Sequence, residues 1–321
     1  MTGSRTLALP DVAVPDFSRW RAGNTGVEGV WQFDAGVPGR HVLVTALLHG
    51  NEFCGAHVVA ALLDAGVRPR RGRLTLALCN LAAFDRFDPA APDVSRFVDE
   101  DMNRVWTAER LADGSSVERR RAQALLPFIR TTDWLLDLHS MHEPGAPLLM
   151  AGTAPRHLAL ALRLGAPAHV VVDAGHADGC RLRDHAQFAT DGRPDALALL
   201  LEAGYHFDPA STDTALDMTA RFLTTSEVVD RAQIPPAWWT PRPPKQTVLS
   251  VTDAVVARSI DFAFTEAFTG LDVIERAGTV IAHDAGQAVV TPYDACVLVM
   301  PSLRQLRPGV TVVRLARSAA G

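Results

Sequence analysis

The sequence contains few cysteines, and it has no long apolar run. Its four cysteines, Cys54, Cys79, Cys180 and Cys296, lie far apart, and none belongs to a Cys-x-x-Cys pair. This spacing argues against a disulfide framework and against a zinc site built from thiolates. No apolar stretch approaches the roughly 20 residues that a membrane-spanning helix needs.

The sequence also lacks an excess of basic charge. Lysine and arginine total 31 against 36 acidic residues, which gives a formal net charge of −5. Such a balance provides no field to attract nucleic acid or anionic lipid, and we interpret the dense basic stretches 68–73 and 119–121 as solvated surface. The N-terminus lacks the apolar core and basic flank of a signal peptide. The sequence therefore predicts a cytoplasmic protein that binds neither nucleic acid nor a membrane.

The first two-thirds of the chain alternate short apolar runs with longer runs of helical spacing. Strands are expected at Val42–Leu48, Leu74–Leu78, Trp134–Leu138, His169–Val172 and Ala196–Leu201. Helices are expected at Ala56–Leu63, Val117–Ile129, Pro155–Leu164 and Asp213–Val229. Several of the strand runs are apolar on both faces, as in a sheet that helices cover on both sides. This pattern predicts an α/β sandwich.

A proline-rich segment marks a change of character near residue 240. Ile234–Lys245 holds five prolines and two tryptophans, and proline stiffens the chain and removes backbone donors, so a domain junction is expected there. Short strands are expected beyond it, at Val248–Val256, Val280–Ala282, Gln287–Thr291, Cys296–Met300 and Val310–Leu315. We therefore predict a catalytic domain over 1–240 and a small β-rich domain over 241–321.

The first motif with chemical content is L-L-H-G-N-E at 47–52. His49 and Glu52 should emerge at the carboxyl end of a buried strand, where open α/β sheets bind ligands. A His-x-x-Glu pair at that point can direct an imidazole nitrogen and a carboxylate at one zinc ion. The alternative is that His49 is an ordinary loop residue and that Glu52 is a favourable charge at a helix N-terminus.

The second motif, W-L-L-D-L-H-S at 134–140, is another apolar strand with a polar end. Asp137 and His139 are two residues apart and share a face, so the acid could orient the histidine through its second nitrogen. Both could instead make only surface hydrogen bonds. Taken together, the two motifs supply two histidines and one carboxylate, which is a catalytic zinc set with a fourth position open for water.

Two further segments complete a candidate active site. The apolar strand at 196–201 ends in Glu202, where partial desolvation would raise the pKa of the carboxyl and suit it to acid/base work. The segment R-F-V-D-E-D-M-N-R at 96–104 offers Arg96, Asn103 and Arg104 to an oxyanion and a substrate carboxylate. The alternatives are a solvated glutamate and surface ion pairs between Asp99–Asp101 and the arginines.

With these segments in hand, the chain resembles the succinylglutamate desuccinylase/aspartoacylase family, relatives of the zinc carboxypeptidases. The resemblance rests on H-G-N-E (49–52), R-F-V-D-E-D-M-N-R (96–104), D-L-H-S (137–140) and E-A-G (202–204), in the family's order. It extends through G-T-V-I-A-H-D (278–284), T-P-Y-D-A-C-V-L-V (291–299) and R-P-G (307–309). It implies a carboxypeptidase-like α/β/α sandwich with a mixed central sheet, and a smaller β-rich domain that narrows access to the site.

The resemblance also implies a role for each matched residue. His49, Glu52 and His139 would hold one Zn²⁺, and Glu202 would accept a proton from water and pass it to the leaving amine. Arg96 would polarise the scissile carbonyl and stabilise the oxyanion. The substrate carboxylate would be held by Asn103 and Arg104. The expected partner is therefore a small N-acylated amino acid.

The chain departs from the family in its aromatic residues. Aspartoacylases use tyrosines in the substrate pocket, and the two tyrosines here, Tyr205 and Tyr293, match neither place clearly. Arg193 is a candidate second anion contact. Four polar residues after the catalytic strand ends are candidate pocket residues or ordinary loop residues: His142, Glu143, His206 and Asp208.

The expected function is zinc-dependent hydrolysis of the amide bond of a small N-acylated amino acid or related carboxylate. The alternatives are a metallocarboxypeptidase acting on short peptide-like amides and a zinc-binding protein without catalysis. A metal-free α/β hydrolase ranks below these, because the chain has no G-x-S-x-G elbow. Cobalt or manganese could replace zinc with such ligands. The acyl group, the amine and the oligomeric state, a homo-oligomer included, remain open.

Overall fold

The computed structural model describes residues 13–176 and 178–319, so most of the segment searched for a signal peptide lies outside it. The strands are β1 (Val30–Asp34), β2 (His41–Ala46), β3 (Arg73–Leu78), β4 (Trp134–Met141), β5 (Leu148–Ala151), β6 (His169–Val172), β7 (Leu197–Tyr205), β8 (Thr247–Val256), β9 (Ala263–Phe264), β10 (Val273–Ile274), β11 (Val280–Asp284), β12 (Gln287–Val290), β13 (Cys296–Val299) and β14 (Thr311–Ser318). The α-helices are α1 (Cys54–Asp64), α2 (Leu81–Phe84), α3 (Ala108–Ala112), α4 (Val117–Arg130), α5 (Pro155–Leu164) and α6 (Pro209–Thr225).

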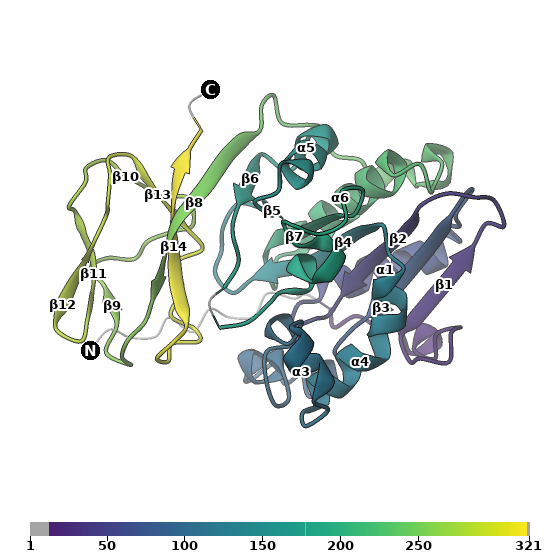
Figure 1. Ribbon diagram of the computed structural model, residues 1–321, viewed down its shortest axis with the longest axis horizontal. Helices are drawn as coiled ribbons and strands as arrows, with labels where there is room; N and C mark the ends of the chain where they lie inside the picture. Colours follow the sequence, from purple (N-terminus) through teal and green to yellow (C-terminus); the bar gives the residue numbers. More distant parts are fainter. Residues whose placement is uncertain (1–12, 177, 320–321) are drawn as a thin grey trace.

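Eleven strands form one mixed sheet in the order β1-β3-β2-β4-β7-β5-β6-β8-β14-β13-β10 (Figure 1). The strands β3, β2, β4 and β7 run parallel to one another, whereas β5 runs antiparallel to β7. Because β2, β4 and β7 are parallel neighbours, their carboxyl ends lie along the same edge of the sheet. The predicted α/β sandwich with a mixed central sheet is confirmed.

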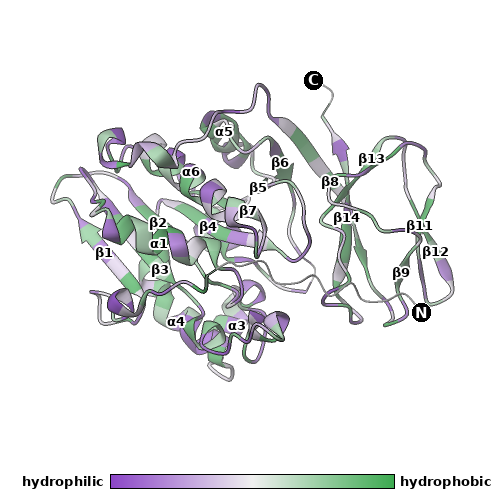
Figure 2. Ribbon diagram, turned by 180° about the vertical axis from the view of Figure 1, so that it is seen from behind, coloured by the Kyte–Doolittle hydropathy of each residue, from purple (hydrophilic) through white to green (hydrophobic). Residues whose placement is uncertain are grey.

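Helices cover both faces of the part of this sheet that contains β2, β3, β4 and β7. Alternate residues of one strand point to opposite faces, and Val42 and Val44 of β2 accordingly join one apolar core while Leu43 joins another. The first core is closed by α1, α5 and α6, and the second by α4. In Figure 2 the strands are mostly green and the outer helices carry the purple segments. The continuous apolar runs of the sequence therefore correspond to strands buried on both faces.

The C-terminal region, residues 241–321, continues the same sheet. Strand β8 pairs in parallel with β6 over Thr247–Ser250 and then pairs antiparallel with β14. A second sheet of three strands, β12-β11-β9, packs beside it. Residues of β5, β6 and β7 share an apolar core with β8, β13 and β14. The small β-rich part is thus present, while the domain boundary at 240/241 stays a prediction.

The elements differ from expectation at several places. The helix α6 begins at Pro209 and ends at Thr225, four residues earlier at both ends than predicted, because Asp208 caps it by accepting a hydrogen bond from the Ala210 amide. Short strands such as β5 and β10 carry too few residues for a periodic signal and escaped detection. No helix in the described part of the chain is long and apolar enough to span a membrane.

Candidate functional site

The three predicted ligands lie together at the carboxyl edge of the sheet. His49 and Glu52 follow β2, and His139 lies near the end of β4. One ligand atom from each of these side chains lies within 4.8 Å of the others, and all three residues are buried. We call His49, Glu52 and His139 the metal-ligand cluster.

The turn after β2 is shaped to present His49. Leu47, which follows β2, adopts a left-handed backbone with φ of 56°, a conformation that costs a residue with a side chain about 1–2 kcal/mol. Gly50 is required for a different reason: a Cβ there would lie 2.4 Å from the Phe84 amide nitrogen and 2.4 Å from the Ser95 carbonyl oxygen. The glycine therefore permits close backbone approach, which brings the 92–104 segment over the cluster.

Glu52 lies between the two histidines. Its Oε1 is 2.8 Å from His49 Nδ1, and its Oε2 is 2.7 Å from His139 Nδ1. Burial alone would raise the pKa of Glu52, but the two imidazoles outweigh it and hold that pKa well below its ordinary value. The carboxylate is therefore ionised, as a metal ligand must be.

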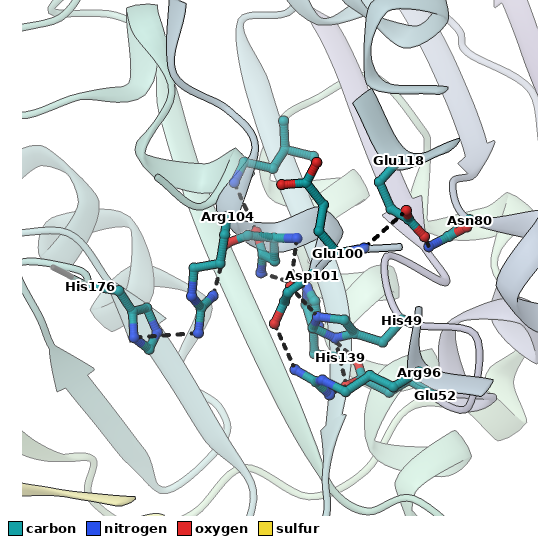
Figure 3. A network of polar contacts seen from close by, with 12 residues as sticks. His49, Glu52, Asn80, Arg96, Glu100, Asp101, Arg104, Glu118, His139 and His176 are labelled. Atoms are coloured by element: carbon teal, nitrogen blue, oxygen red, sulfur yellow. Dashed lines mark hydrogen bonds and ion pairs between the residues drawn. The ribbon is translucent and has the colours of Figure 1, made fainter. Parts of the chain in front are cut away.

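A second acid holds the far nitrogen of each histidine. Asp137 Oδ2 is 2.9 Å from His139 Nε2. Asp101 Oδ1 is 2.8 Å from His49 Nε2, and Figure 3 shows these two side chains together. The expected pairing of Asp137 with His139 is present. The sequence interpretation missed the role of Asp101, because it assigned that residue to arginine pairs; no local spacing indicates its contact with His49, which lies 52 positions earlier.

These contacts fit a divalent metal ion. Both histidines direct Nδ1 at the same carboxylate and fix Nε2 on an aspartate, the outer arrangement that sets tautomer and ring orientation in metal sites. Two imidazoles and one carboxylate are a common catalytic zinc set.

Glu202 projects from β7 beside the cluster. It lies opposite His139 in the β4–β7 register, and its Oε2 is buried without a hydrogen-bond partner among the described residues. Burial raises the pKa of Glu202 to about 8, and the negative Glu52 adds to this. A carboxyl whose pKa lies near neutrality suits proton transfer in both directions.

Arg96 lies over the same cluster. Its Nη1 donates to Glu52 Oε1 at 3.0 Å, and its Nη2 lies 3.5 Å from Asp101 Oδ2. Glu52 belongs to the cluster and Asp101 holds His49, so the ion pair of Arg96 lies inside the site and not on the surface, where the alternative interpretation placed it. The Arg96 guanidinium therefore contacts the metal-ligand cluster and lines the pocket beside it.

The 96–104 segment is anchored by Glu118, which the sequence interpretation overlooked. The carboxylate of this fully buried residue of α4 accepts hydrogen bonds from the backbone amides of Val98, Asp99 and Glu100, and from Asn80 Nδ2. Figure 3 shows Glu118 and Asn80 together at one end of this network. An anion that gathers three successive amides fixes the backbone from which Arg96 and Asp101 extend.

Asn103 and Arg104 are also in the site, with contacts that differ from each other. Asn103 is buried; its Oδ1 accepts from the Leu182 amide at 2.9 Å, and its Nδ2 lies 3.4 Å from His139 Nε2. Arg104 pairs with Asp178 at 3.1 Å and lies 3.3 Å from His176 Nδ1. Arg104 thus faces the pocket, while Asn103 ties the 182 loop to the cluster.

A pocket opens at the cluster, lined by residues between His49 and Glu202 and by residues of the C-terminal region. The predicted site residues all line it: His49, Glu52, Arg96, Asn103, Arg104, His139 and Glu202. His142 and Glu143 also line it, whereas His206 and Asp208 do not. The C-terminal region contributes Met300, Gln305, Arg307 and Arg314, among others.

Three residues considered for substrate contact lie elsewhere. Arg193 is outside the pocket, and its exposed side chain pairs with Asp133 and with Asp195. Neither tyrosine lines the pocket, and Tyr293 instead lies 2.6 Å from Thr252 Oγ1 through its hydroxyl. Arg193 therefore does not reach the pocket that the other site residues line.

Fold and site together define a mixed α/β protein with a candidate metal centre at the carboxyl ends of its central strands. Residues 38–225 match the sequence model of the succinylglutamate desuccinylase/aspartoacylase catalytic domain, which is more than half of the chain. The chain therefore belongs to this family of hydrolases that act on amide bonds.

Individual relatives agree with this assignment. A probable aspartoacylase from Parasynechococcus marenigrum is 35% identical over 131 residues, which cover 38% of this chain and 41% of that protein. Succinylglutamate desuccinylase from Vibrio cholerae has a similar structure, with a TM-score of 0.66 and 18% identity over 91% of this chain and 86% of its own. A succinylglutamate desuccinylase/aspartoacylase from Rhodobacter sphaeroides gives a TM-score of 0.62 at 15% identity over 89% and 87% of the two chains. At these identities the structures establish a shared fold.

Proposed function

We propose that this chain hydrolyses the amide bond of a small N-acylated amino acid or related carboxylate, using one Zn²⁺ held by His49, Glu52 and His139. The observation that carries the proposal is the convergence of two imidazoles, each braced by an aspartate, on one ionised carboxylate. Zinc bound there would lower the pKa of a water molecule from about 15.7 towards ~7 and polarise a carbonyl group.

The remaining chemistry belongs to the protein's own side chains. Glu202 accepts a proton from the attacking water and donates it to the leaving amine, which its raised pKa permits. Arg96 donates to the carbonyl oxygen as negative charge develops on it. The substrate carboxylate is held by Asn103 and Arg104, of which Arg104 presents its guanidinium to the pocket.

Chelation and reconstitution test this proposal. Protein depleted of metal by a chelator should lose turnover of N-acetyl and N-succinyl amino acids and regain it with added zinc, and cobalt or manganese should restore part of it. The His49→Ala variant should lose bound metal as well. Activity that survives chelation would exclude the scheme. Preferential turnover of short peptides would favour a carboxypeptidase, and metal binding without any hydrolysis would indicate a non-catalytic zinc protein.

A further inference from the structure

The strand β2 carries a buried hydroxyl group at Thr45. All six residues of β2 are buried, and Thr45 is 1% exposed between Val44 and Ala46. Burying a hydroxyl costs free energy unless it finds a hydrogen-bond partner. The expectation of an apolar strand at Val42–Leu48 gave Thr45 no role, so its partner in the folded chain shows what the hydroxyl does there.

The partner of Thr45 is the carboxylate of Asp137 on the neighbouring strand. The two residues are opposite each other in the parallel β2–β4 register, and Thr45 Oγ1 donates to Asp137 Oδ1 at 2.7 Å. The Leu136 carbonyl oxygen is 3.5 Å from the same Oγ1, which is too far to compete for the single hydroxyl proton. Thr45 therefore directs its hydrogen at the acid that braces His139.

Asp137 is fully buried and depends on few donors. Its Oδ2 lies 2.9 Å from His139 Nε2, so within residues 13–176 and 178–319 each of its carboxylate oxygens has one hydrogen-bond partner. Asp101, the other bracing acid, instead accepts from the Asn103 amide and from the Arg96 guanidinium. A cation and a backbone amide thus support Asp101, whereas a neutral hydroxyl supports Asp137.

We propose that Thr45 is a positioning residue for the metal site, which fixes the Asp137 carboxylate and, through it, the ring of His139. This inference rests on the metal site of the proposed function. Strand β2 then serves the cluster twice, since it leads into His49 and also holds His139 through Thr45 and Asp137. An acid that is held on one oxygen presents the other in a fixed direction, and such outer contacts set the tautomer and orientation of a ligand.

The zinc affinity of the Thr45→Val variant tests this role without turnover. Valine has nearly the shape of threonine and lacks the hydroxyl, so the buried Asp137 Oδ1 would lose its donor. In competition with a chromophoric chelator, Thr45→Val should bind zinc about 3–10-fold more weakly than the wild type, less than the effect of removing an outer carboxylate. Thr45→Ser keeps the hydroxyl and should return the affinity to within about two-fold of the wild type. Equal affinity in Thr45→Val and the wild type would overturn the proposal, and so would a loss in Thr45→Ser as large as that in Thr45→Val.

Thr132→Val is the matched control. Thr132 is also fully buried, but its hydroxyl donates to the Phe128 carbonyl oxygen at 2.9 Å, and the residue lies outside the pocket. The same exchange of threonine for valine there should lower the free energy of unfolding and leave the zinc affinity unchanged. If Thr132→Val weakens zinc binding as much as Thr45→Val does, the effect is a general loss of stability and the proposal fails.

The visible absorption of the cobalt-substituted protein gives a second readout, because it depends on the geometry of the ligands around Co²⁺. The spectrum should change in Thr45→Val and match that of the wild type in Thr45→Ser and Thr132→Val. A spectrum like that of the wild type in Thr45→Val would show that His139 keeps its orientation without the hydroxyl, and this would overturn the proposal.

The two proposals fail in different ways. Zinc binding that does not depend on the Thr45 hydroxyl would remove the positioning role while amide hydrolysis stood. Hydroxyl-dependent zinc binding in a protein that hydrolyses no amide would instead remove the proposed function and leave the role of Thr45 in place. A wild-type protein that binds no zinc would remove both, and the wild-type measurement alone shows this.

Discussion

Two groups of residues that line the pocket, the metal-ligand cluster and a set of three arginines, are assembled in different ways. The metal-ligand cluster comes from adjacent strands, β2 and β4, and two of its members are three positions apart in the chain. The other group consists of Arg104, Arg181 and Arg314, which line the same pocket but come from distant parts of the sequence. Arg314 pairs with Asp173, which lies 141 positions earlier. Short sequence motifs therefore indicate the metal-ligand cluster, whereas only the folded chain shows that the three arginines line the same pocket. The two groups therefore differ in how far apart in the sequence their members lie, although both line the same pocket.

The largest expected effect concerns Glu202, which lies opposite His139 and lines the pocket. The Glu202→Gln variant should keep its metal and lose about 10²–10⁴-fold in kcat, the usual contribution of a general acid/base. Steady-state kinetics together with metal analysis measure both quantities. Glu266→Gln, at an exposed site in the C-terminal region, serves as the control. Comparable turnover in the two variants would show that the proton passes through another group.

A second test asks whether the segment over the metal-ligand cluster depends on the buried carboxylate of Glu118. In Glu118→Gln the new amide group would face two backbone N–H donors and leave them unpaired, at a cost of about 1–3 kcal/mol each. We expect the free energy of unfolding to fall by about 2–4 kcal/mol in chemical denaturation, and kcat/KM to fall as Arg96 moves. Glu109→Gln, on the exposed face of α3, should change neither. An unchanged stability would mean that the 98–100 backbone holds itself in place.

The sequence predicted those site residues that belong to a short, recognisable motif. An apolar run that ends in His49, His139 or Glu202 can be recognised in the sequence, because about ten consecutive residues contain both the buried strand and its polar end. Asp101 and Glu118 carry no such signal: each is one acid among several in its segment, and its partner is fixed only when the 92–104 segment folds over Gly50. Arg193 was a candidate anion contact because it precedes the Glu202 strand, whereas the fold places Arg181 and Arg314, and not Arg193, at the pocket.

A third test compares the two acids that brace the histidines. Asp101→Asn and Asp137→Asn should each weaken zinc binding about 10–100-fold, the usual result of removing an outer carboxylate. Competition against a chromophoric chelator measures this affinity. The isosteric Asn at 101 still offers an acceptor to the Asn103 amide, so loss of the cap does not confound the result. Exposed Asp191→Asn is the control. Unaltered zinc affinity in both variants would show that packing alone orients the imidazoles.

The smallest expected effect is on the acid sensitivity of the folded state, and it concerns His157, a buried residue near Arg183. His157 of α5 is 1% exposed, and neither ring nitrogen has a partner in the described part of the chain. Burial, aided by Arg183 and Arg156, lowers the pKa of His157 from its ordinary 6.5 to about 4. The unfolded chain therefore binds more protons between pH 6.5 and pH 4, so folded-state stability declines as the pH falls through this window. At pH 5.5 the loss is about 1.4 kcal/mol, and at pH 7.5 it is close to zero.

His157→Leu removes this proton site and breaks no hydrogen bond. Denaturation at the two pH values should show the variant gaining about 1.4 kcal/mol on the wild type at pH 5.5 relative to the difference at pH 7.5. His41, whose pKa burial also lowers to about 4, remains in the variant, so part of the acid sensitivity must persist. A stability difference that is the same at both pH values would mean that His157 titrates normally. In that case water would reach the side chains of α5 that pack near Arg183. This part of the protein would then be less rigid than the metal-ligand cluster.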